Sequence, residues 1–188
     1  MRNASHGVRL RKMIVYAMLG TILFLGKLIM EGLPNIHPIA MFITAFTLVY
    51  RTEALIPIYI YVFLTGLYGG FNLWWVPYLY IWTILWLVIM LLPKHLPNRA
   101  AFVLYAVVCM LFGLAYGTLY APAQAILFGY DFATTIKWII SGLPFDVMHG
   151  IGNLVMSILV LPLAKLLRQL NRQIGIPSSQ PVPNRVKP

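Results

Sequence analysis

Three polar side chains in the apolar stretch 145–167 have the types and spacing needed to contact a small molecule together. Asp146, His149 and Asn153 are three and then four positions apart, so a helix places them on one face. Asp146 could instead stabilise the first turn of that helix through the helix dipole. Polar groups inside an apolar helix normally face a bundle interior or a cavity. The spacing is therefore compatible with ligand contact and with hydrogen bonds between helices.

A second polar group follows the first apolar stretch, in a loop broken by prolines. Glu31, Asn35 and His37 lie close together there, and with His149 they could formally ligate a transition metal. Their sequence spacing does not define a metal site, and the sequence carries no nucleophile-elbow, phosphate-loop or dinucleotide motif. We therefore expect a ligand-binding role for these residues, with no metal, no cofactor and no catalytic residue.

Aromatic residues form a third candidate group. Tyr78, Trp82 and Trp86 recur at every fourth position, which places them on one face of a helix. Trp74 and Trp75 precede that stretch, where an interfacial aromatic belt is also expected. The pattern is typical either of a wall for a flat ligand or of packing between helices. We take Trp74, Trp75, Tyr78 and Trp82 as candidate ligand contacts.

Membrane helices must position these side chains. The chain is 61% hydrophobic and 10% charged, which is too apolar for a soluble core of 188 residues. A helix of about 20 apolar residues crosses the hydrocarbon of a bilayer. The sequence predicts an all-α integral membrane protein whose six transmembrane helices lie at about 13–30, 38–50, 54–71, 77–92, 100–119 and 145–167.

These spans form one membrane domain, residues 13–168. A basic tail at 1–12 precedes it, and a tail at 169–188, which we expect to be disordered, follows it. Residues 120–144 show the weakest pattern. We expect an irregular break near 121–125 and an interfacial amphipathic helix near 133–140.

The distribution of charge predicts the orientation. Twelve of the 14 Lys and Arg residues fall on the side of this topology that holds both tails, and only Lys27 and Lys137 fall on the other. Because positively charged loops resist translocation, both termini are expected in the cytoplasm of a bacterial cell, with the ligand candidates facing outside. The net charge of +10 then reflects topology and contact with anionic lipids, and we expect no nucleic-acid partner.

Small residues mark the first span. Ala17, Gly20 and Thr21 would let another helix approach closely, either from the same chain or from a partner protein.

With these features the chain resembles the substrate-binding S component of an energy-coupling-factor (ECF) transporter. The resemblance covers most of residues 13–168. Besides the topology and the small residues of the first span, it rests on four runs: Glu31-Gly-Leu-Pro-Asn-Ile-His-Pro, Trp74-Trp-Val-Pro-Tyr-Leu-Tyr-Ile-Trp, Gly117-Thr-Leu-Tyr-Ala-Pro-Ala-Gln-Ala and Pro144-Phe-Asp-Val-Met-His-Gly-Ile-Gly-Asn.

The resemblance implies a compact bundle that captures a micronutrient, usually a vitamin, from outside the cell. A transmembrane coupling subunit and two cytoplasmic ATPases would complete the importer. Ala17, Gly20 and Thr21 would dock on the coupling subunit, although Thr21 stands where the family has a second Ala. Aromatic residues and few charges favour a flat, largely neutral cargo, with cobalamin or another tetrapyrrole slightly ahead of a pterin, flavin or pyridoxine-like ring.

Two other classes of protein stay open. An MreD-like membrane scaffold is a similar small bundle that needs no ligand, and the polar cluster at Asp146, His149 and Asn153 argues against it. An intramembrane enzyme could use Asp146 and His149 as acid and base, but no nucleophile or set of metal ligands accompanies them.

Overall fold

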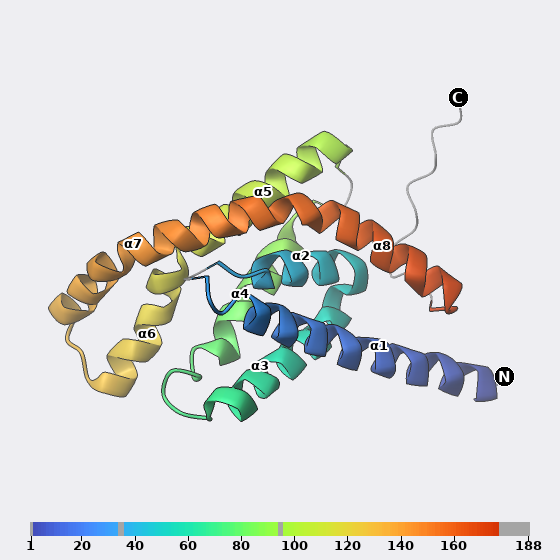
Figure 1. The fold of residues 1–188 in the computed structure, drawn as a ribbon, viewed down its shortest axis with the longest axis horizontal. Helices are drawn as coiled ribbons and strands as arrows, with labels where there is room; N and C mark the ends of the chain where they lie inside the picture. The colour runs from blue at the N-terminus through green and yellow to red at the C-terminus, as the bar shows by residue number, and fades with distance from the viewer. Residues whose placement is uncertain (1, 34–35, 94–95, 177–188) are drawn as a thin grey trace.

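The protein is all-α in a computed structural model that describes residues 2–33, 36–93 and 96–176 (Figure 1). The α-helices of this part are α1 Arg2–Ile29, α2 Ile39–Tyr50, α3 Leu55–Gly69, α4 Tyr78–Leu91, α5 Asn98–Leu114, α6 Tyr116–Phe128, α7 Phe132–Met156 and α8 Val160–Gln173. Two short 3₁₀ turns, η1 Arg51–Ala54 and η2 Ser157–Leu159, connect α2 to α3 and α7 to α8. The expected N-terminal tail is part of α1 from Arg2 onward. Of the expected C-terminal tail, α8 includes the part up to Gln173, and residues 177–188 lie outside the described part.

Four helical runs in the described part are long and apolar enough to cross a membrane, which indicates a multi-pass membrane protein. They are His6–Ile29, Ile39–Gly69, Asn98–Phe128 and Phe132–Gln173, and Tyr78–Leu91 is a shorter apolar helix. The prediction of six spanning helices is therefore wrong. The expected spans at 38–50 and 54–71 fall in a single run, in which α2 has 12 residues and α3 has 15. Each is shorter than the about 20 residues that a full crossing needs.

Arg51, the first residue of η1, separates α2 from α3. Its φ of 54° is the one positive φ outside glycine among the described residues, in a region of backbone conformation that side chains rarely adopt. Two hydrogen bonds hold the turn against α4. Arg51 Nη2 donates to Met90 O at 2.9 Å, and Trp86 Nε1 donates to Arg51 O at 2.9 Å.

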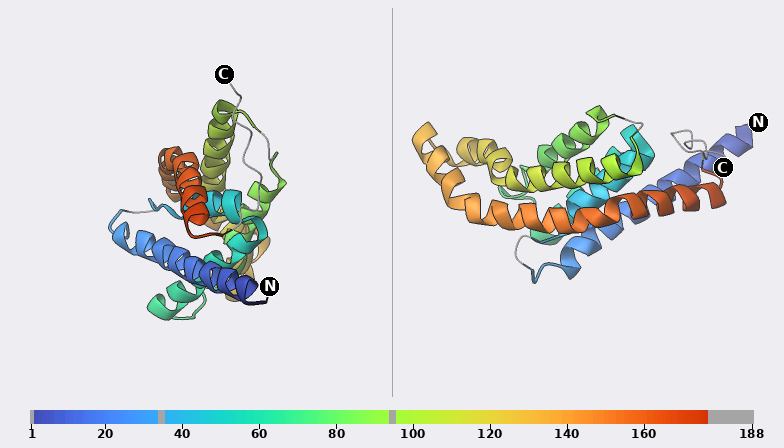
Figure 2. Two further views of the ribbon diagram at one scale, coloured as in Figure 1. Left: turned by 90° about the vertical axis from the view of Figure 1, so that its right-hand side faces the viewer. Right: turned by 90° about the horizontal axis from the view of Figure 1, so that it is seen from above.

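The core of the bundle surrounds α2. All of its residues except Phe42 are buried, as expected for a helix that is apolar on every side. It packs mainly against α4 and α8, while α1 lies on α3 and α5 lies on α7 (Figures 1 and 2).

Glycines bring α5 and α7 unusually close together. A Cβ added at Gly113 of α5 would lie 2.7 Å from the Gly150 nitrogen and from the His149 carbonyl of α7. Backbone atoms cannot move aside as a flexible side chain can, so even alanine does not fit at Gly113. The close contact thereby fixes the position of His149 relative to α5.

Polar contacts join the helices at the end of the molecule where α1 begins and α8 ends (Figure 2). Lys12 Nζ donates to both Glu53 carboxylate oxygens at 2.9 Å, and Tyr16 OH donates to Glu53 Oε2 at 2.9 Å. Arg168 Nη2 of α8 donates to Leu48 O of α2 at 3.1 Å. We call this region the basic end; it comprises Lys12, Tyr16, Leu48, Tyr50, Arg51, Glu53, Trp86, Met90, Arg168 and Asn171.

Residues 120–144 are helical on both sides of one turn. The expected break at 121–125 lies inside α6, and the expected interfacial helix at 133–140 is the first part of α7. Gly129, with a φ of 67°, ends α6, and Asp131 caps α7 by accepting a hydrogen bond from Thr134 N at 2.7 Å. The expected irregular break is wrong, because residues 121–125 are helical with Pro122 inside α6. The helix expected at 133–140 is present as the first part of α7, and its interfacial position stays a prediction.

Candidate functional site

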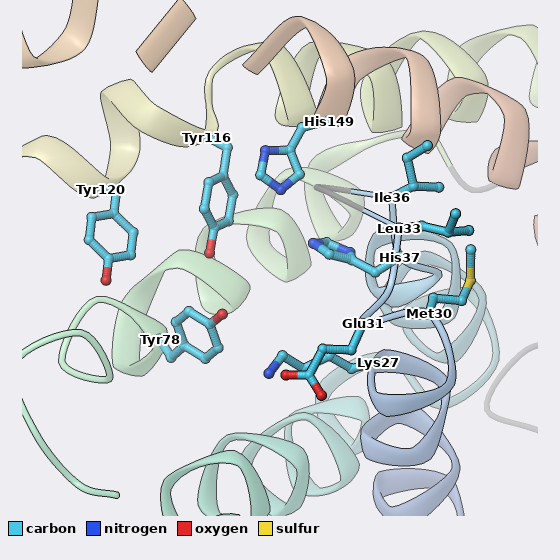
Figure 3. Close-up of a pocket in the computed structure, with 10 residues that line it drawn as sticks. All are labelled: Lys27, Met30, Glu31, Leu33, Ile36, His37, Tyr78, Tyr116, Tyr120 and His149. Atoms are coloured by element: carbon cyan, nitrogen blue, oxygen red, sulfur yellow. The ribbon is translucent and has the colours of Figure 1, made fainter. Parts of the chain in front are cut away.

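A cavity of about 300 Å³ lies between the segment that links α1 to α2 and the helices α4, α6 and α7. Figure 3 shows side chains from these separate elements arranged around one space. The lining residues are Lys27, Met30, Glu31, Leu33, Ile36, His37, Tyr78, Tyr116, Tyr120 and His149.

Two histidines form one side of this cavity. The ring centroids of His37 and His149 are 5.3 Å apart, and the Nδ1 atom of each is buried with no hydrogen-bond partner among the described residues. Burial, followed by repulsion from His149, lowers the pKa of His37 from its ordinary 6.5 to about 3. His37 is therefore a neutral imidazole at physiological pH, able to donate one hydrogen bond and accept another.

Aromatic rings continue the wall beside the histidines. The Tyr116 ring lies 4.7 Å from the His149 ring at an angle of 38°. Trp82 lies behind the lining, with its ring 5.5 Å from Tyr78, 5.9 Å from Tyr116 and 6.4 Å from His37. Its Nε1 is buried and has no partner in the described part. The cavity is thus backed by a continuous set of flat surfaces.

Asp146 and Asn153 are buried on α7 with His149 but make contacts within the bundle. Asp146 Oδ1 accepts a hydrogen bond from Gly117 N at 2.8 Å, at the start of α6, while its Oδ2 is buried without a described partner. Asn153 Nδ2 donates to Cys109 O of α5 at 3.1 Å. These contacts position α6 and α5 against α7.

Trp74 and Trp75 also make contacts outside the lining. Tyr120 OH donates to Trp74 O at 2.6 Å, and Trp75 Nε1 donates to Val62 O at 2.7 Å. These two hydrogen bonds hold the turn before α4 against α6 and α3. The first of them also supports the position of Tyr120.

The structure brings four of the ten ligand candidates to the cavity: Glu31, His37, Tyr78 and His149. Asn35 lies outside the described residues. Lys27, Tyr116 and Tyr120 line the cavity but were not among the candidates. Tyr116 and Tyr120 have the same four-residue spacing as Tyr78 and Trp82, so the periodicity used for α4 could have found them. Lys27, a charge near the end of an apolar stretch, was a further signal.

The small residues of α1 face two directions. Ala17 and Thr21 are exposed, with Thr21 Oγ1 donating to Ala17 O at 2.9 Å. Gly20 is buried against α3, where an added Cβ would lie 2.6 Å from Ile60. Gly20 thus serves internal packing in this structure, while Ala17 and Thr21 remain on the surface.

Comparison of the chain with protein-family models, curated proteins and solved structures finds no match. Among the described residues, no group of three or more His, Cys, Asp or Glu side chains could hold a metal ion.

Proposed function

We propose that this chain is the substrate-capture subunit of an ECF-type importer, which binds a water-soluble vitamin or related micronutrient and depends on separate ATPase subunits. The cavity is the observation that carries the proposal. Two of its lining residues have buried polar atoms without described partners, Nδ1 of His37 and Nδ1 of His149. Because such atoms cost about 1–3 kcal/mol each when left unpaired, a ligand that pairs with them would gain affinity.

The size of the cavity favours a small cargo. Its volume of about 300 Å³ is at the lower limit of the roughly 300–1,000 Å³ typical of small-molecule sites. A compound with one or two rings fits this space better than a tetrapyrrole. Among the cargoes considered above, a pterin or a pyridoxine-like ring is thereby favoured over cobalamin.

The orientation follows from the basic end. Placing Lys12, Arg51 and Arg168 in the cytoplasm satisfies the preference of positive charge for that side. Both described ends of the chain lie there, with α1 beginning and α8 ending at the same end of the molecule (Figure 2). The cavity then lies toward the outside of a bacterial cell membrane, where a nutrient arrives.

The exposed face of α1 is the proposed docking surface for the transmembrane coupling subunit. Ala17 and Thr21 are exposed there beside Met18 and Ile22, which are 58% and 43% exposed. Small side chains flanked by apolar ones suit close contact between helices in a membrane. A tryptophan at Ala17 should therefore abolish uptake while leaving ligand binding intact.

Mass spectrometry of the small molecule that co-purifies with the protein tests the proposal. Wild-type protein, purified in mild detergent from cells grown in rich medium and then heat-denatured, should release one compound at close to one per chain. The His149→Ala variant should release much less, and His6→Ala, which changes an exposed histidine on α1, should release as much as wild type. A wild-type protein that carries no compound, and that no mixture of vitamins stabilises against heat, would contradict capture and favour the scaffold.

A further inference from the structure

The polar atoms of the cavity specify what the edge of a ligand must offer. His37 and His149 together present two N–H donors and two acceptor nitrogens when both rings are neutral. Each ring has a buried Nδ1 without a described partner, and His149 as a residue is only 8% exposed. A ligand with donors and acceptors along one edge can pair with both rings. A hydrocarbon ring pairs with neither.

The walls of the cavity specify a flat ligand. The rings of His149 and Tyr116 lie 4.7 Å apart, and the Tyr78 ring contacts Trp82 edge-on at 5.5 Å and 82°. Aromatic surfaces of this kind favour planar molecules through offset or edge contacts. The space of about 300 Å³ accommodates one or two rings.

The charges around the cavity specify a ligand without net charge. Among the described lining residues, Lys27 and Glu31 are the charged ones, and their charges are opposite. His37 is neutral, since burial and then repulsion from His149 lower its pKa to about 3. Asp146 lies one turn before His149 on α7 and is bound to Gly117 N. An anion such as a phosphate ester would be repelled by Glu31, whose charge already balances that of Lys27.

From these observations, and resting on the proposed function, we infer that the cavity binds an uncharged planar nitrogen heterocycle of one or two rings, with hydrogen-bond donors and acceptors along the edge that faces His37 and His149. Its substituent points toward Lys27 and Glu31 at the end of α1. The tyrosines Tyr78, Tyr116 and Tyr120 could instead surround a quaternary ammonium ion, an alternative that Lys27 disfavours.

Defined probes test this inference on the full chain in detergent micelles by calorimetry. Uracil, xanthine and lumazine carry N–H and C=O groups on rings of increasing size, and 1,3-dimethyllumazine has the same ring system with its N–H donors blocked. Choline tests the cation. We expect at least one of the first three to bind, dimethyllumazine to bind at least tenfold more weakly than lumazine if lumazine is bound, and choline not to bind.

Matched variants assign the binding to the histidines. His149→Phe keeps a flat ring and removes both nitrogens, so it should weaken the binding of the best probe about tenfold to a hundredfold. His6→Phe should leave it unchanged. Thermal unfolding of each variant shows whether it is folded, and His37→Phe supplies a second test if His149→Phe does not fold.

Binding of choline in preference to the heterocycles, equal binding of the blocked and unblocked lumazines, or no binding of any heterocycle would overturn the inference. The co-purifying compound separates this failure from failure of the proposed function. A bound phosphate ester, tetrapyrrole or quaternary ammonium compound would contradict the inference that the ligand is an uncharged heterocycle, but would still support substrate capture. A protein that neither carries nor binds any small molecule would overturn both.

Discussion

The basic end and the cavity both bury polar groups, but they differ in whether those groups have partners. At the basic end, Glu53 accepts from Lys12 and Tyr16, and Tyr50 OH donates to Asn171 Oδ1 at 3.1 Å. The buried side-chain atoms without a described partner all lie in or beside the cavity region: His37 Nδ1, Tyr61 OH, Trp82 Nε1, Asp146 Oδ2 and His149 Nδ1.

This difference separates stability from binding. Paired polar groups hold helices in register, while unpaired ones lower the stability of the empty protein by about 1–3 kcal/mol each. A binding site that is incomplete without its ligand accepts that loss, as functional sites commonly do. Changes at the basic end should therefore alter unfolding and spare affinity, whereas changes at the cavity should alter affinity.

The largest expected effect comes from Gly113→Ala, which disrupts the contact between α5 and α7 that positions His149. The added Cβ would meet the backbone of His149 and Gly150 at 2.7 Å, so α5 and α7 must separate. We expect a loss of about 3 kcal/mol in stability and loss of ligand binding, measured by denaturant unfolding and calorimetry. Gly142→Ala on α7 is the control, because a Cβ there meets nothing within 4 Å. Wild-type behaviour of Gly113→Ala would show that the crossing is looser than the structure has it.

Acidification should destabilise the cavity region through His37. Its pKa is lowered to about 3 in the folded protein by burial and then by His149, so below the ordinary 6.5 the unfolded chain binds the extra proton. Stability is therefore fully present above pH 6.5 and falls as the pH drops from 6.5 toward 3, by about 2 kcal/mol between pH 7 and pH 5.

The measurement is urea unfolding at a series of pH values for wild type and for His37→Gln. His149, Lys27 and Glu31 also line the cavity and remain in both proteins, so the difference between the two curves belongs to His37. Curves that stay parallel from pH 7 to pH 5 would remove His37 as the cause.

Glu53→Leu tests the basic end. The variant leaves Lys12 and Tyr16 without their acceptor, and the expected loss is about 1 kcal/mol because the Lys12 and Glu53 side chains are 26% and 41% exposed. Ligand affinity should not change. The double variant Lys12→Met/Glu53→Leu should recover part of the loss, since it removes the unpaired ammonium. A fall in affinity would mean that the two regions are coupled.

The smallest effect is expected from the substitution Trp→Phe, made separately at Trp82 and at Trp86 of α4. These two variants compare the cavity and the basic end most directly. Trp86 Nε1 donates to Arg51 O at 2.9 Å, whereas Trp82 Nε1 has no described partner. Both Trp→Phe variants lose ring volume, but only Trp86→Phe loses a hydrogen bond. We expect Trp86→Phe to be less stable than Trp82→Phe by about 1 kcal/mol in thermal unfolding. The opposite order would show that Trp82 Nε1 is paired in the folded protein.

Composition was enough to predict helices in a membrane, because no soluble core could bury a chain that is 61% hydrophobic. The number of long helices could not be predicted in the same way. The break between 50 and 54 was predicted, but not that α2 and α3 on either side are only 12 and 15 residues long, joined by a 3₁₀ turn that hydrogen bonds from Trp86 and to Met90 hold. The helix propensities of neighbouring residues do not predict such tertiary contacts.

The candidate site was predictable where one helix or one loop determined it. The periodicity of α4 and α7 pointed to Tyr78 and His149, and the proline-containing loop pointed to His37. Asn153 could not be assigned from its face alone, because its partner, the Cys109 carbonyl, belongs to α5. Tyr116 was missed although the span expected at 100–119 contains it, because its position depends on the break between α5 and α6 and on the contact between Gly117 and Asp146.

The helical run from Phe132 through Gln173 is continuous, and α7 crosses α5 most closely at Gly150. Any rotation of α7 against α5 would therefore pivot near Gly150. Phe132 is 18 residues from Gly150, which is about 27 Å along a helix, so a rotation of about 10° at the crossing would carry the tip of α7 by about 5 Å. His149, next to this crossing, would barely shift. Tyr120 OH donates to Trp74 O at 2.6 Å and its ring stacks on Trp138 with centroids 6.1 Å apart, so such a rotation would have to break one of these two contacts. A rotation of α7 about this crossing would therefore change the cavity wall at Tyr120 more than the wall at His149.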